Sequence, residues 1–523
     1  MSFRLTYASM FDPPASMHEA FEAALSHLRR QLGATHGLYL QGQDEPHRPT
    51  QRLLSPIDTR LELGRFAIAG PEDVERAMQA ARAAYPAWRA TPPAARVALL
   101  RRVAELMQQR VYAIAAALAL EVGKTRMEAL GETQETVDFF RQYADDFERA
   151  RDFDVPLPDD PLAGVRATNR SVLRPHGVWL VIAPFNYPLA LMGGPTAAAL
   201  VTGNVVVAKG SPHTPWGGRL LADCLRDAGV PPGVFQWLHG DTHELGTALA
   251  AHPDVAGITF TGSVAVGRAL LAQCAGGRWP RPCIAEMGGK NPCIVTEHAD
   301  LDAAAAGIVR SAYGLSGQKC SALSRLYVHR RVADALIERV QAQTAALSVG
   351  DPTERRHGMG PVNNAAARAR FEHSLQQLRQ GGATLLAGGT QLLEGMYAHG
   401  HFVAPTLVEA PSAHPLWRQE LFLPLLMLQR VDSRAQAMQL ANDSEVGLSA
   451  GFYGAADEVA WFHEHIEAGV TYANRAQGAT TGAWPGYQPF GGWKGSGSSG
   501  KAIASFYYLP LYLREQSRTV VIT

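Results

Sequence analysis

The hydrophobic pattern changes character about a third of the way along the chain. Residues 71–149 place apolar side chains at helical spacing and are rich in Ala, Leu, Arg and Glu, which predicts a run of amphipathic helices. From residue 178 onward, short apolar runs alternate with amphipathic stretches. We expect strands at 178–182, 205–208, 235–238 and 257–260, with helices near 220–228 and 245–251. This repetition predicts a parallel sheet in a doubly wound α/β domain.

A second α/β unit is expected after residues 283–287, where the pattern indicates a hinge. It would contain a strand at 325–328 and a helix at 333–347. The segment 506–521 is aromatic and β-prone, and it would need a partner strand, which a second subunit could supply. We divide the chain into an N-terminal extension, a first α/β domain, a second α/β domain and a C-terminal segment, at residues 1–50, 51–285, 286–485 and 486–523.

Length, charge and cysteine content narrow the class of protein. A chain of 523 residues fits two or three lobes at ~150 residues each. Forty-eight Lys and Arg balance 48 Asp and Glu, so neither nucleic acid nor an anionic membrane is an expected partner. No apolar run reaches the ~18 residues that a membrane span requires. The five cysteines form no CxxC pair, which argues against a disulfide framework and for a reduced, cytoplasmic protein.

Two segments carry residues suited to acyl chemistry. Cys320 follows Gly317-Gln318-Lys319, so it lies in a polar, glycine-containing loop, whereas most free cysteines are small buried hydrophobes. Glu286 ends an apolar run and precedes Gly288-Gly289. A thiolate attacks carbonyl carbon, and a carboxylate can activate the water that releases the product. Taken alone, Glu286 could equally be a solvated carboxylate at a strand end.

Further segments follow in a fixed order: Ala-Pro-Phe-Asn-Tyr-Pro at 183–188, Lys209 after an apolar run, Phe-Thr-Gly-Ser at 260–263, and Gln-Glu-Leu-Phe at 419–422. Together with the Cys320 and Glu286 segments, they resemble the aldehyde dehydrogenase superfamily from roughly residue 50 to the C-terminus. The resemblance implies a Rossmann-type dinucleotide-binding domain and a second α/β catalytic domain. It also implies a β oligomerisation element near 150–175 and in the C-terminal tail, and therefore a homodimer or a higher homo-oligomer.

The resemblance assigns the catalytic roles. Cys320 is the nucleophile, and Glu286 is the general base, whose presence favours hydrolysis to a free acid over transfer to coenzyme A. Asn186, together with the Cys320 N–H, stabilises the oxyanion, since losing one such donor typically costs ~3 kcal/mol. Without the resemblance, Asn186 would read equally well as a turn asparagine beside proline.

A dinucleotide site is implied at the ends of the predicted strands, where open α/β sheets bind ligands and helix N-termini favour pyrophosphate. The resemblance places cofactor contacts at Lys209, Gly262, Ser263, Gly267, Glu420 and Phe422. Two positions depart from the family pattern. Pro212 replaces a glutamate common in NAD-preferring members, and Leu423 replaces a glycine. NAD is the expected cofactor, with NADP as the alternative.

Three segments, 137–141, 317–328 and 488–492, resemble the 1-pyrroline-5-carboxylate dehydrogenases, which oxidise glutamate γ-semialdehyde to glutamate in proline catabolism. In that subgroup, serines receive the substrate α-carboxylate, and the matching positions are Ser321 and Ser496. Tyr187 is expected to contact the substrate, and Glu135 is a candidate partner for its ammonium group. Ordinary loop serines and a helix-surface salt bridge are the alternatives. The loop also departs from the subgroup at Ser498, Ile503 and Ala504.

Other functions stay open at this point. A related enzyme could act on a different aliphatic aldehyde or semialdehyde, and a non-catalytic scaffold could retain the fold. No metal site is expected, because His463-Glu464-His465 lacks an evident third ligand.

Overall fold

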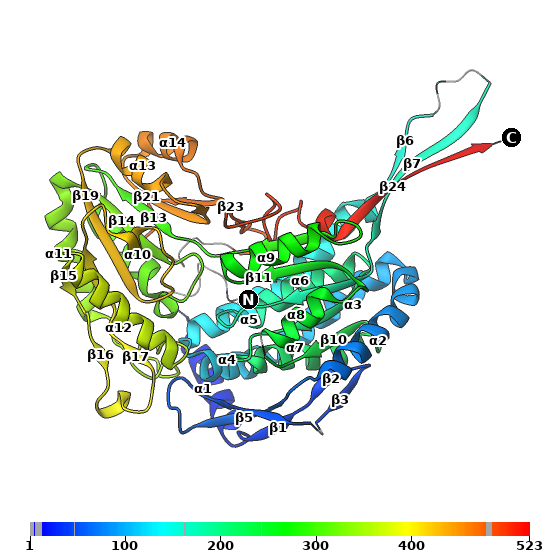
Figure 1. The fold of residues 1–523 in the computed structure, drawn as a ribbon, viewed down its shortest axis with the longest axis horizontal. Helices are drawn as coiled ribbons and strands as arrows, with labels where there is room; N and C mark the ends of the chain where they lie inside the picture. The colour runs from blue at the N-terminus through cyan, green and yellow to red at the C-terminus, as the bar shows by residue number, and fades with distance from the viewer. Residues whose placement is uncertain are drawn as a thin grey trace.

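The computed structural model describes residue 5 and residues 13–46, 48–159, 161, 164–241, 243–476 and 484–522. Two lobes, each built around a seven-stranded sheet, lie side by side, and a three-stranded arm projects from one of them (Figure 1). The mixed α/β architecture with two largely parallel sheets confirms the predicted fold class.

The first sheet has the strand order β12-β11-β8-β9-β10-β2-β3. Its parallel strands are β8 (Val178–Ile182), β9 (Val205–Lys209), β10 (Phe235–Leu238), β11 (Val255–Thr261) and β12 (Cys283–Glu286). The antiparallel strands β2 (Leu38–Leu40) and β3 (Gln43–Glu45) extend one edge. The chain runs from β8 outward to β10 and then returns to β11 on the other side of β8. The carboxyl ends of β8 and β11 therefore flank the point where the strand order reverses, which is where such sheets bind ligands.

Helices cover both faces of this sheet. The helices α6 (Ala190–Val201) and α7 (Pro215–Asp227) pack on one face, beneath an outer layer of α3 (Pro93–Gln109), α4 (Val111–Val122) and α5 (Arg126–Arg149). The helices α2 (Pro71–Ala90) and α8 (Glu244–Ala251) contact the sheet and each other, while α9 (Val264–Ala275) packs on β12. Because parallel crossovers are right-handed, α8 and α9 lie on the face opposite α6 and α7.

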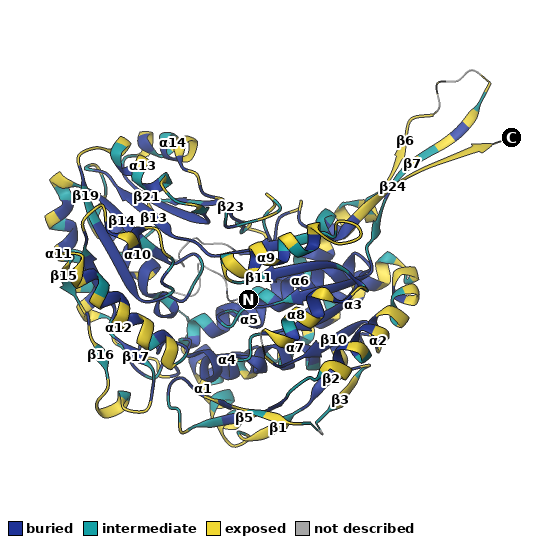
Figure 2. Cartoon of the chain, in the orientation of Figure 1, coloured by how far each residue is buried: buried dark blue, intermediate teal, exposed yellow. Residues whose placement is uncertain are grey.

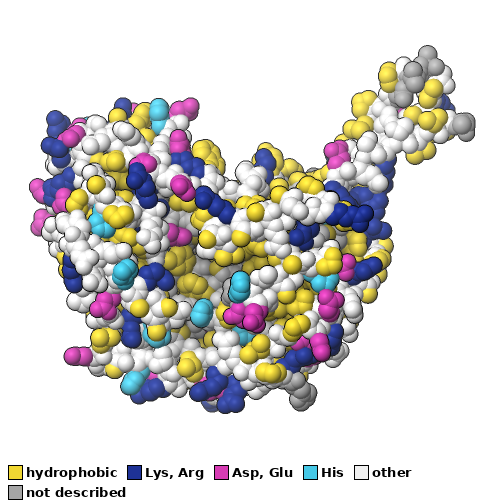
Figure 3. All heavy atoms as spheres, in the orientation of Figure 1, with side chains coloured by type: hydrophobic (Ala, Val, Ile, Leu, Met, Phe, Trp, Pro, Cys, Tyr) yellow, Lys and Arg dark blue, Asp and Glu magenta, His cyan; other side chains and the backbone are white. Residues whose placement is uncertain are grey.

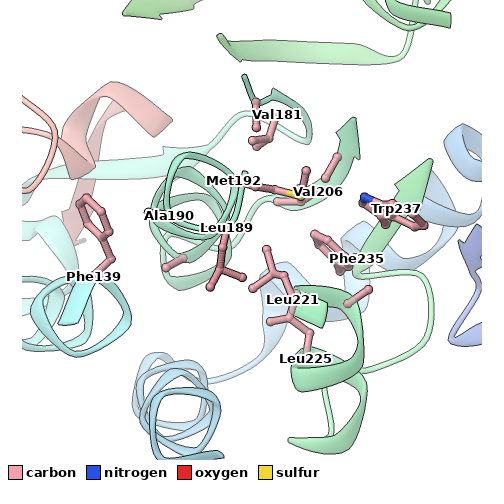
Figure 4. Close-up of a cluster of buried hydrophobic side chains, with 14 of the residues drawn as sticks. Phe139, Val181, Leu189, Ala190, Met192, Val206, Leu221, Leu225, Phe235 and Trp237 are labelled. Atoms are coloured by element: carbon pink, nitrogen blue, oxygen red, sulfur yellow. The ribbon is translucent and has the colours of Figure 1, made fainter. Parts of the chain in front are cut away.

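The central part of this lobe is apolar on both sides of the sheet. Figure 4 shows Met192 of α6 and Leu221 of α7 pointing toward Val206 and Phe235 on the sheet, with Phe139 of α5 on the far side of α6. Strands buried on both faces need continuous apolar runs, which explains Val178-Trp179-Leu180-Val181.

The second sheet has the order β15-β18-β19-β14-β13-β21-β22 and is parallel except for β15. Its strands are β13 (Asn291–Val295), β14 (Leu323–His329), β15 (Thr384–Ala387), β18 (Thr406–Glu409), β19 (Leu425–Val431), β21 (Ser449–Tyr453) and β22 (Val470–Ala473). Alternate residues of β13 enter different cores: Cys293 and Val295 pack with α10 (Leu301–Tyr313) and α11 (Arg330–Ala346), and Ile294 packs on the other face. That face is covered by α12 (Ala365–Gln380), α13 (Arg434–Asn442) and α14 (Ala456–His465).

The arm consists of β6 (Asp154–Leu157), β7 (Arg166–Pro175) and β24 (Leu513–Ile522) in the order β24-β7-β6. The predicted β-prone tail is thus only partly a strand: residues 509–512 form a 3₁₀ turn, and Tyr508 and Tyr512 are buried in the first lobe. The strand pairs with β7 of the same chain along its whole length, so a second subunit is not needed to supply its partner. Figure 2 shows the outer part of the arm as largely exposed.

The remaining elements are short. A three-stranded sheet contains β1 (Ala34–His36), β4 (Thr50–Leu54) and β5 (Glu62–Ala67), and α1 (Ala15–Arg29) packs on α4. Two-stranded pairs join β16 (Gln391–Leu392) with β17 (Phe402–Val403) and β20 (Val446–Gly447) with β23 (Trp493–Lys494). The strands β2 and β3 precede residue 50, yet they belong to the first sheet; the proposed domain division itself stays a prediction. Within the described ranges, no helix is long and apolar enough to cross a membrane.

Candidate active site

A cavity of about 420 Å³ lies between elements of the two lobes. Its walls come from the carboxyl ends of β8, β9 and β11, from the loop that carries Cys320, and from residues 420–422. On the face seen in Figure 3, the surface is hollowed between the lobes, and hydrophobic side chains gather in the hollow. The cavity brings together seven of the predicted site residues: Asn186, Lys209, Gly262, Ser263, Cys320, Glu420 and Phe422.

Cys320 lies in a loop whose backbone conformation is tightly constrained. Leu315, Ser316 and Gly317 have φ values of 50°, 54° and 68°, so the backbone follows a left-handed path that side chains tolerate poorly. A Cβ on Gly317 would lie 2.1 Å from the Leu423 carbonyl oxygen, and only glycine fits there. The Ser316 hydroxyl donates to the Gly360 carbonyl at 2.7 Å and fixes the loop from below.

The Cys320 thiol is protonated at neutral pH. Burial raises its pKa to about 12, and the nearby Glu420 and Glu286 carboxyl groups add to the shift. The backbone N–H groups of Ser321 and Cys320 lie within hydrogen-bonding reach of the sulfur and partly oppose this effect. The nucleophile must therefore lose a proton as it attacks, which requires a base in the cavity.

Glu286 is one candidate for that base, and its carboxyl group influences the Cys320 thiol. It is the last residue of β12, its side chain is 5% exposed, and Met287 and Gly288 beyond it line the cavity. Burial raises its pKa well above the usual range, while the Gly492 N–H partly stabilises the carboxylate. Its Oε2 has no hydrogen-bond partner among the described residues, so one oxygen is available to a proton or a water.

Asn186 lies between β8 and α6, close to the Cys320 loop. Its side chain is 3% exposed, and Nδ2 donates a 2.8 Å hydrogen bond to the Gln318 carbonyl. An amide NH₂ has two hydrogens, so a second donor remains. The structure thus brings the three predicted catalytic residues into one region; their roles stay predictions until tested.

The part of the cavity at the end of β9 and the start of α9 has the features of a dinucleotide site. Lys209 ends β9 and is 1% exposed; burial lowers its pKa to about 8, with Asp241 partly opposing the shift. Ser263 caps α9, whose N-terminus faces the cavity. Gly267 allows close packing, because a Cβ there would lie 2.4 Å from the Met287 sulfur. The Lys209 ammonium, the N-terminus of α9 and the close packing at Gly267 together suit an anionic dinucleotide.

Glu420 and Phe422 line the same cavity. Oε1 of Glu420 accepts a 3.2 Å hydrogen bond from the Gly289 N–H, and burial raises the pKa of this carboxyl to about 7. Phe422 has a φ of 58° and packs edge-on against Phe185, with ring centroids 5.7 Å apart. Leu423, the departure from the family glycine, has its carbonyl packed against Gly317.

The predicted substrate contacts have different environments. Tyr187 is partly buried, with the Lys124 ammonium 3.5 Å from its ring centroid. Ser321 is 8% exposed and follows the nucleophile directly. Ser496 is fully buried; its hydroxyl donates to the Gly288 carbonyl at 2.7 Å and accepts from the Gly447 N–H at 3.1 Å. Its one hydrogen is used in the bond to Gly288, and the contact of Ser496 with a substrate carboxylate stays a prediction.

Sequence reasoning missed a buried polar group beside Asn186. Lys124 is fully buried and forms an ion pair of 2.5 Å with Glu132. Glu132 also accepts the N–H groups of Leu189 and Ala190. Glu132 stands beside the polar residues Thr133 and Gln134, so the hydrophobic pattern gave no sign that it is buried.

Comparison with known proteins agrees with this geometry. Residues 44–515 match the aldehyde dehydrogenase family. The chain belongs to that family. It is 36% identical over 511 residues, covering 96% of both chains, to the 1-pyrroline-5-carboxylate dehydrogenase of Geobacillus thermodenitrificans.

Solved structures show the same likeness. A 1-pyrroline-5-carboxylate dehydrogenase from Thermus with bound NAD superposes with a TM-score of 0.92 at 34% identity, covering 98% of each chain. Proline utilization A from Bdellovibrio bacteriovorus gives a TM-score of 0.91 at 31% identity, covering 97% of this chain and 52% of that one. The predicted family and the oxidoreductase class are thereby confirmed.

Proposed function

We propose that this aldehyde dehydrogenase oxidises L-glutamate γ-semialdehyde to L-glutamate with NAD. The observation that carries the proposal is the hydrogen bond between Asn186 and the Cys320 loop, which joins an oxyanion donor to a nucleophile beside the buried Glu286. The likeness to 1-pyrroline-5-carboxylate dehydrogenases over nearly the whole chain supports this substrate.

Lys209, Ser263 and Glu420 would hold the dinucleotide. The Lys209 ammonium lies where a ribose would meet the end of β9, and the α9 N-terminus suits the pyrophosphate. Glu420 is suited to accept hydrogen bonds from the second ribose. When bound, the nicotinamide accepts the hydride that the oxidised carbon loses.

In the first half-reaction, Cys320 attacks the aldehyde carbon as its proton passes to Glu286. The raised pKa of Glu286 makes this carboxylate a better proton acceptor than an ordinary glutamate. The new S–C bond turns the carbonyl oxygen into an oxyanion, which accepts hydrogen bonds from the free Asn186 N–H and the Cys320 backbone N–H. Loss of hydride from this carbon leaves a thioester on Cys320.

After the first half-reaction, Glu286 releases the Cys320 proton to solvent. In the second half-reaction, Glu286 accepts a proton from a water molecule that attacks the thioester. The C–S bond breaks, the acid departs, and the sulfur recovers its proton. The Oε2 atom of Glu286, which lacks a partner among the described residues, is suited to orient that water. Coenzyme A transfer would not need a buried carboxylate there.

Ser321 and Glu135 would recognise the amino-acid end of the substrate. Ser321 lies next to the nucleophile, and its hydroxyl can donate to a carboxylate. Burial raises the pKa of Glu135 to about 8, with Glu132 adding to the shift and Lys124 and Lys319 opposing it. An ammonium group beside Glu135 would favour its charged form. Tyr187 would form part of the wall around the aliphatic chain.

Cofactor preference is a separate proposal. Pro212 occupies the position where an acidic ribose partner is common, and its carbonyl accepts a 3.0 Å hydrogen bond from the Gln51 side chain. We favour NAD, as in the Thermus relative, with NADP as the alternative; the ratio of kcat/KM for the two cofactors decides.

Assembly and location are further proposals. We favour a homodimer or a higher homo-oligomer built through the arm, where Val520, Val521 and Ile522 are at least half exposed. Five free cysteines favour a reduced, cytoplasmic location. We retain the division into a dinucleotide-binding domain at 51–285 and a catalytic domain at 286–485.

The deciding experiment measures NAD reduction with glutamate γ-semialdehyde, with succinic semialdehyde and with propanal, and identifies the product by mass spectrometry. The proposal predicts the highest kcat/KM for glutamate γ-semialdehyde and one glutamate formed per NADH. A higher kcat/KM for either other aldehyde would retain the family and overturn the substrate.

A further inference from the structure

Two carboxylates on one face of α5 each contact one of the loops that deliver the catalytic residues. Glu128 and Glu132 are four residues apart, so their side chains project from the same side of the helix. Glu128 contacts the Cys320 loop, and Glu132 contacts the segment that follows Asn186. Neither has been given a role in the mechanism so far.

Glu128 holds the Cys320 loop at two points. Its Oε1 accepts a 2.7 Å hydrogen bond from the Leu315 N–H and lies 3.3 Å from the Lys319 ammonium. Its Oε2 accepts from the backbone and side chain of Thr125, which fixes the carboxylate to the start of α5. Lys319 directly precedes Cys320, so displacement of this carboxylate would move the nucleophile.

Glu132 holds the Asn186 segment in the same way. Its Oε1 accepts the N–H groups of Leu189 and Ala190 at 2.9 and 3.1 Å, at the N-terminus of α6. Its Oε2 pairs with Lys124, whose ammonium lies against the Tyr187 ring. The backbone N–H groups of Leu189 and Ala190 are therefore tied to one carboxylate directly, and the Tyr187 ring is tied to it through Lys124.

The helix itself is held in close register with α6. A Cβ on Gly193 would lie 2.4 Å from the Thr136 methyl group, so glycine permits α5 and α6 to approach at this point. Glu132, one turn before Thr136, thus has a fixed distance to the α6 N-terminus. Both loops are anchored to a single rigid element, which is the arrangement that preorganised sites require.

We infer that Glu128 and Glu132 are positioning residues. They hold the Cys320 thiol and the Asn186 amide at the relative position that attack on the carbonyl requires. The inference rests on the proposed function, because it assigns these loops their roles in acyl transfer. Glu128 acts through the Cys320 loop, whereas Glu132 acts through the segment that carries Asn186, the oxyanion donor. The two therefore affect different measurable steps.

Two probes separate these steps without an aldehyde or a dinucleotide. Iodoacetamide alkylates the thiolate by displacing iodide and involves no oxyanion, so its rate reports the Cys320 loop. 4-Nitrophenyl acetate acylates Cys320 through a tetrahedral oxyanion and releases 4-nitrophenolate, so its rate reports both loops. Wild-type protein and Cys320→Ala identify the signal that belongs to Cys320.

The three single variants, from Glu to Asp, keep the negative charge and shorten the side chain by one methylene group. Glu132→Asp is expected to lower the acylation rate about 10- to 100-fold and to leave the alkylation rate unchanged. Glu128→Asp is expected to lower both rates about 10-fold or more. Glu148→Asp, on the same helix with a side chain 49% exposed, is the matched control and should change neither rate. The Lys124→Met, Glu132→Leu double variant removes the buried pair together with the acceptor of the Leu189 and Ala190 N–H groups, and it should reproduce the selective loss of acylation.

Unchanged acylation in both Asp variants would overturn the inference. Equal loss of acylation and alkylation in Glu132→Asp, accompanied by a lower Tm and weaker NAD binding, would also overturn it, because that pattern reports general unfolding. The proposed function fails separately: wild-type protein that is acylated at Cys320 but reduces no NAD with any aldehyde would contradict it, while the two probes still test the positioning role.

Discussion

The side-chain amide of Asn186 donates a 2.8 Å hydrogen bond to the backbone carbonyl of Gln318, two residues before Cys320. This bond crosses from the first lobe to the second, and it fixes the donor relative to the nucleophile. The second amide hydrogen remains available for an oxyanion.

Replacing Asn186 with Ala should therefore impair the chemical step most strongly. We expect kcat to fall about 100- to 1,000-fold, the range typical for loss of one oxyanion donor, with NAD binding unchanged. Steady-state kinetics and cofactor titration measure the two effects. Asn169→Ala, at an exposed position in β7, is the control. A kcat close to that of the wild type would contradict the role of Asn186.

The buried Glu286 predicts how hydrolysis depends on pH. A general base acts as the carboxylate, and burial raises its pKa well above 4.5, so deacylation should speed up as pH rises through this elevated pKa. Glu286→Gln should remove that pH dependence and leave the thioester to accumulate. An aliphatic aldehyde serves as substrate, because it has no amino group that could cleave the thioester.

Stopped-flow absorbance of NADH measures this outcome. The variant should form at most one NADH per Cys320 before very slow turnover. It should form this NADH more slowly than the wild type, because Glu286 also accepts the Cys320 proton. Sustained turnover with the wild-type pH profile would show that another group activates the water.

Glu135 should determine preference for the substrate ammonium group. Glu135→Gln removes the negative charge near the predicted ammonium position, and a hydrogen bond to a charged group contributes ~1.5–3 kcal/mol, or about 10- to 150-fold. We expect kcat/KM for glutamate γ-semialdehyde to fall within that range. Succinic semialdehyde lacks the ammonium group, and its kcat/KM should stay the same or rise. Equal losses for both aldehydes would contradict the assignment.

Glu121 provides a test of buried charge on stability. Its carboxyl accepts the N–H groups of Trp216 and Gly217 at the N-terminus of α7, and burial raises its pKa to about 8. The folded protein thus holds a proton that the unfolded chain releases near 4.5, so this group stabilises less as pH rises from 4.5 toward 8.

Glu121→Gln stays neutral at every pH. The Tm of the wild type relative to this variant should therefore fall between pH 5.5 and pH 8, as measured by differential scanning calorimetry. A constant difference in Tm across that interval would contradict the raised pKa.

The sequence predicted four of the seven strands of the first sheet, because strands buried on both faces require unbroken apolar runs such as 178–182 and 205–208. It predicted only one strand of the second sheet, at 325–328. The C-terminal tail was harder to predict. Residues 506–512 have the aromatic content typical of a strand, but Tyr508 and Tyr512 are buried in the first lobe and residues 509–512 form a 3₁₀ turn. The strands at 38–40 and 43–45 have three residues each. Such short strands do not indicate from the sequence that they extend a sheet assembled mainly from residues 178–286.

The candidate catalytic residues were predictable because each lies in a distinctive local segment. The environment of Ser496 was not, because its partners Gly288 and Gly447 are remote in the sequence. The same holds for Glu132, whose importance appears only when α6 is packed beside α5. Local patterns thus predicted the candidate reacting groups, and long-range contacts show which residues hold the segments that carry them.

The central claim is that Cys320 carries the oxidation of glutamate γ-semialdehyde. The most direct measurement compares NADH formation by wild-type protein and Cys320→Ala, with NAD binding measured in both. The account predicts steady NADH formation by the wild type and none by the variant, at equal NAD affinity. NADH formation by Cys320→Ala at the wild-type rate would contradict it.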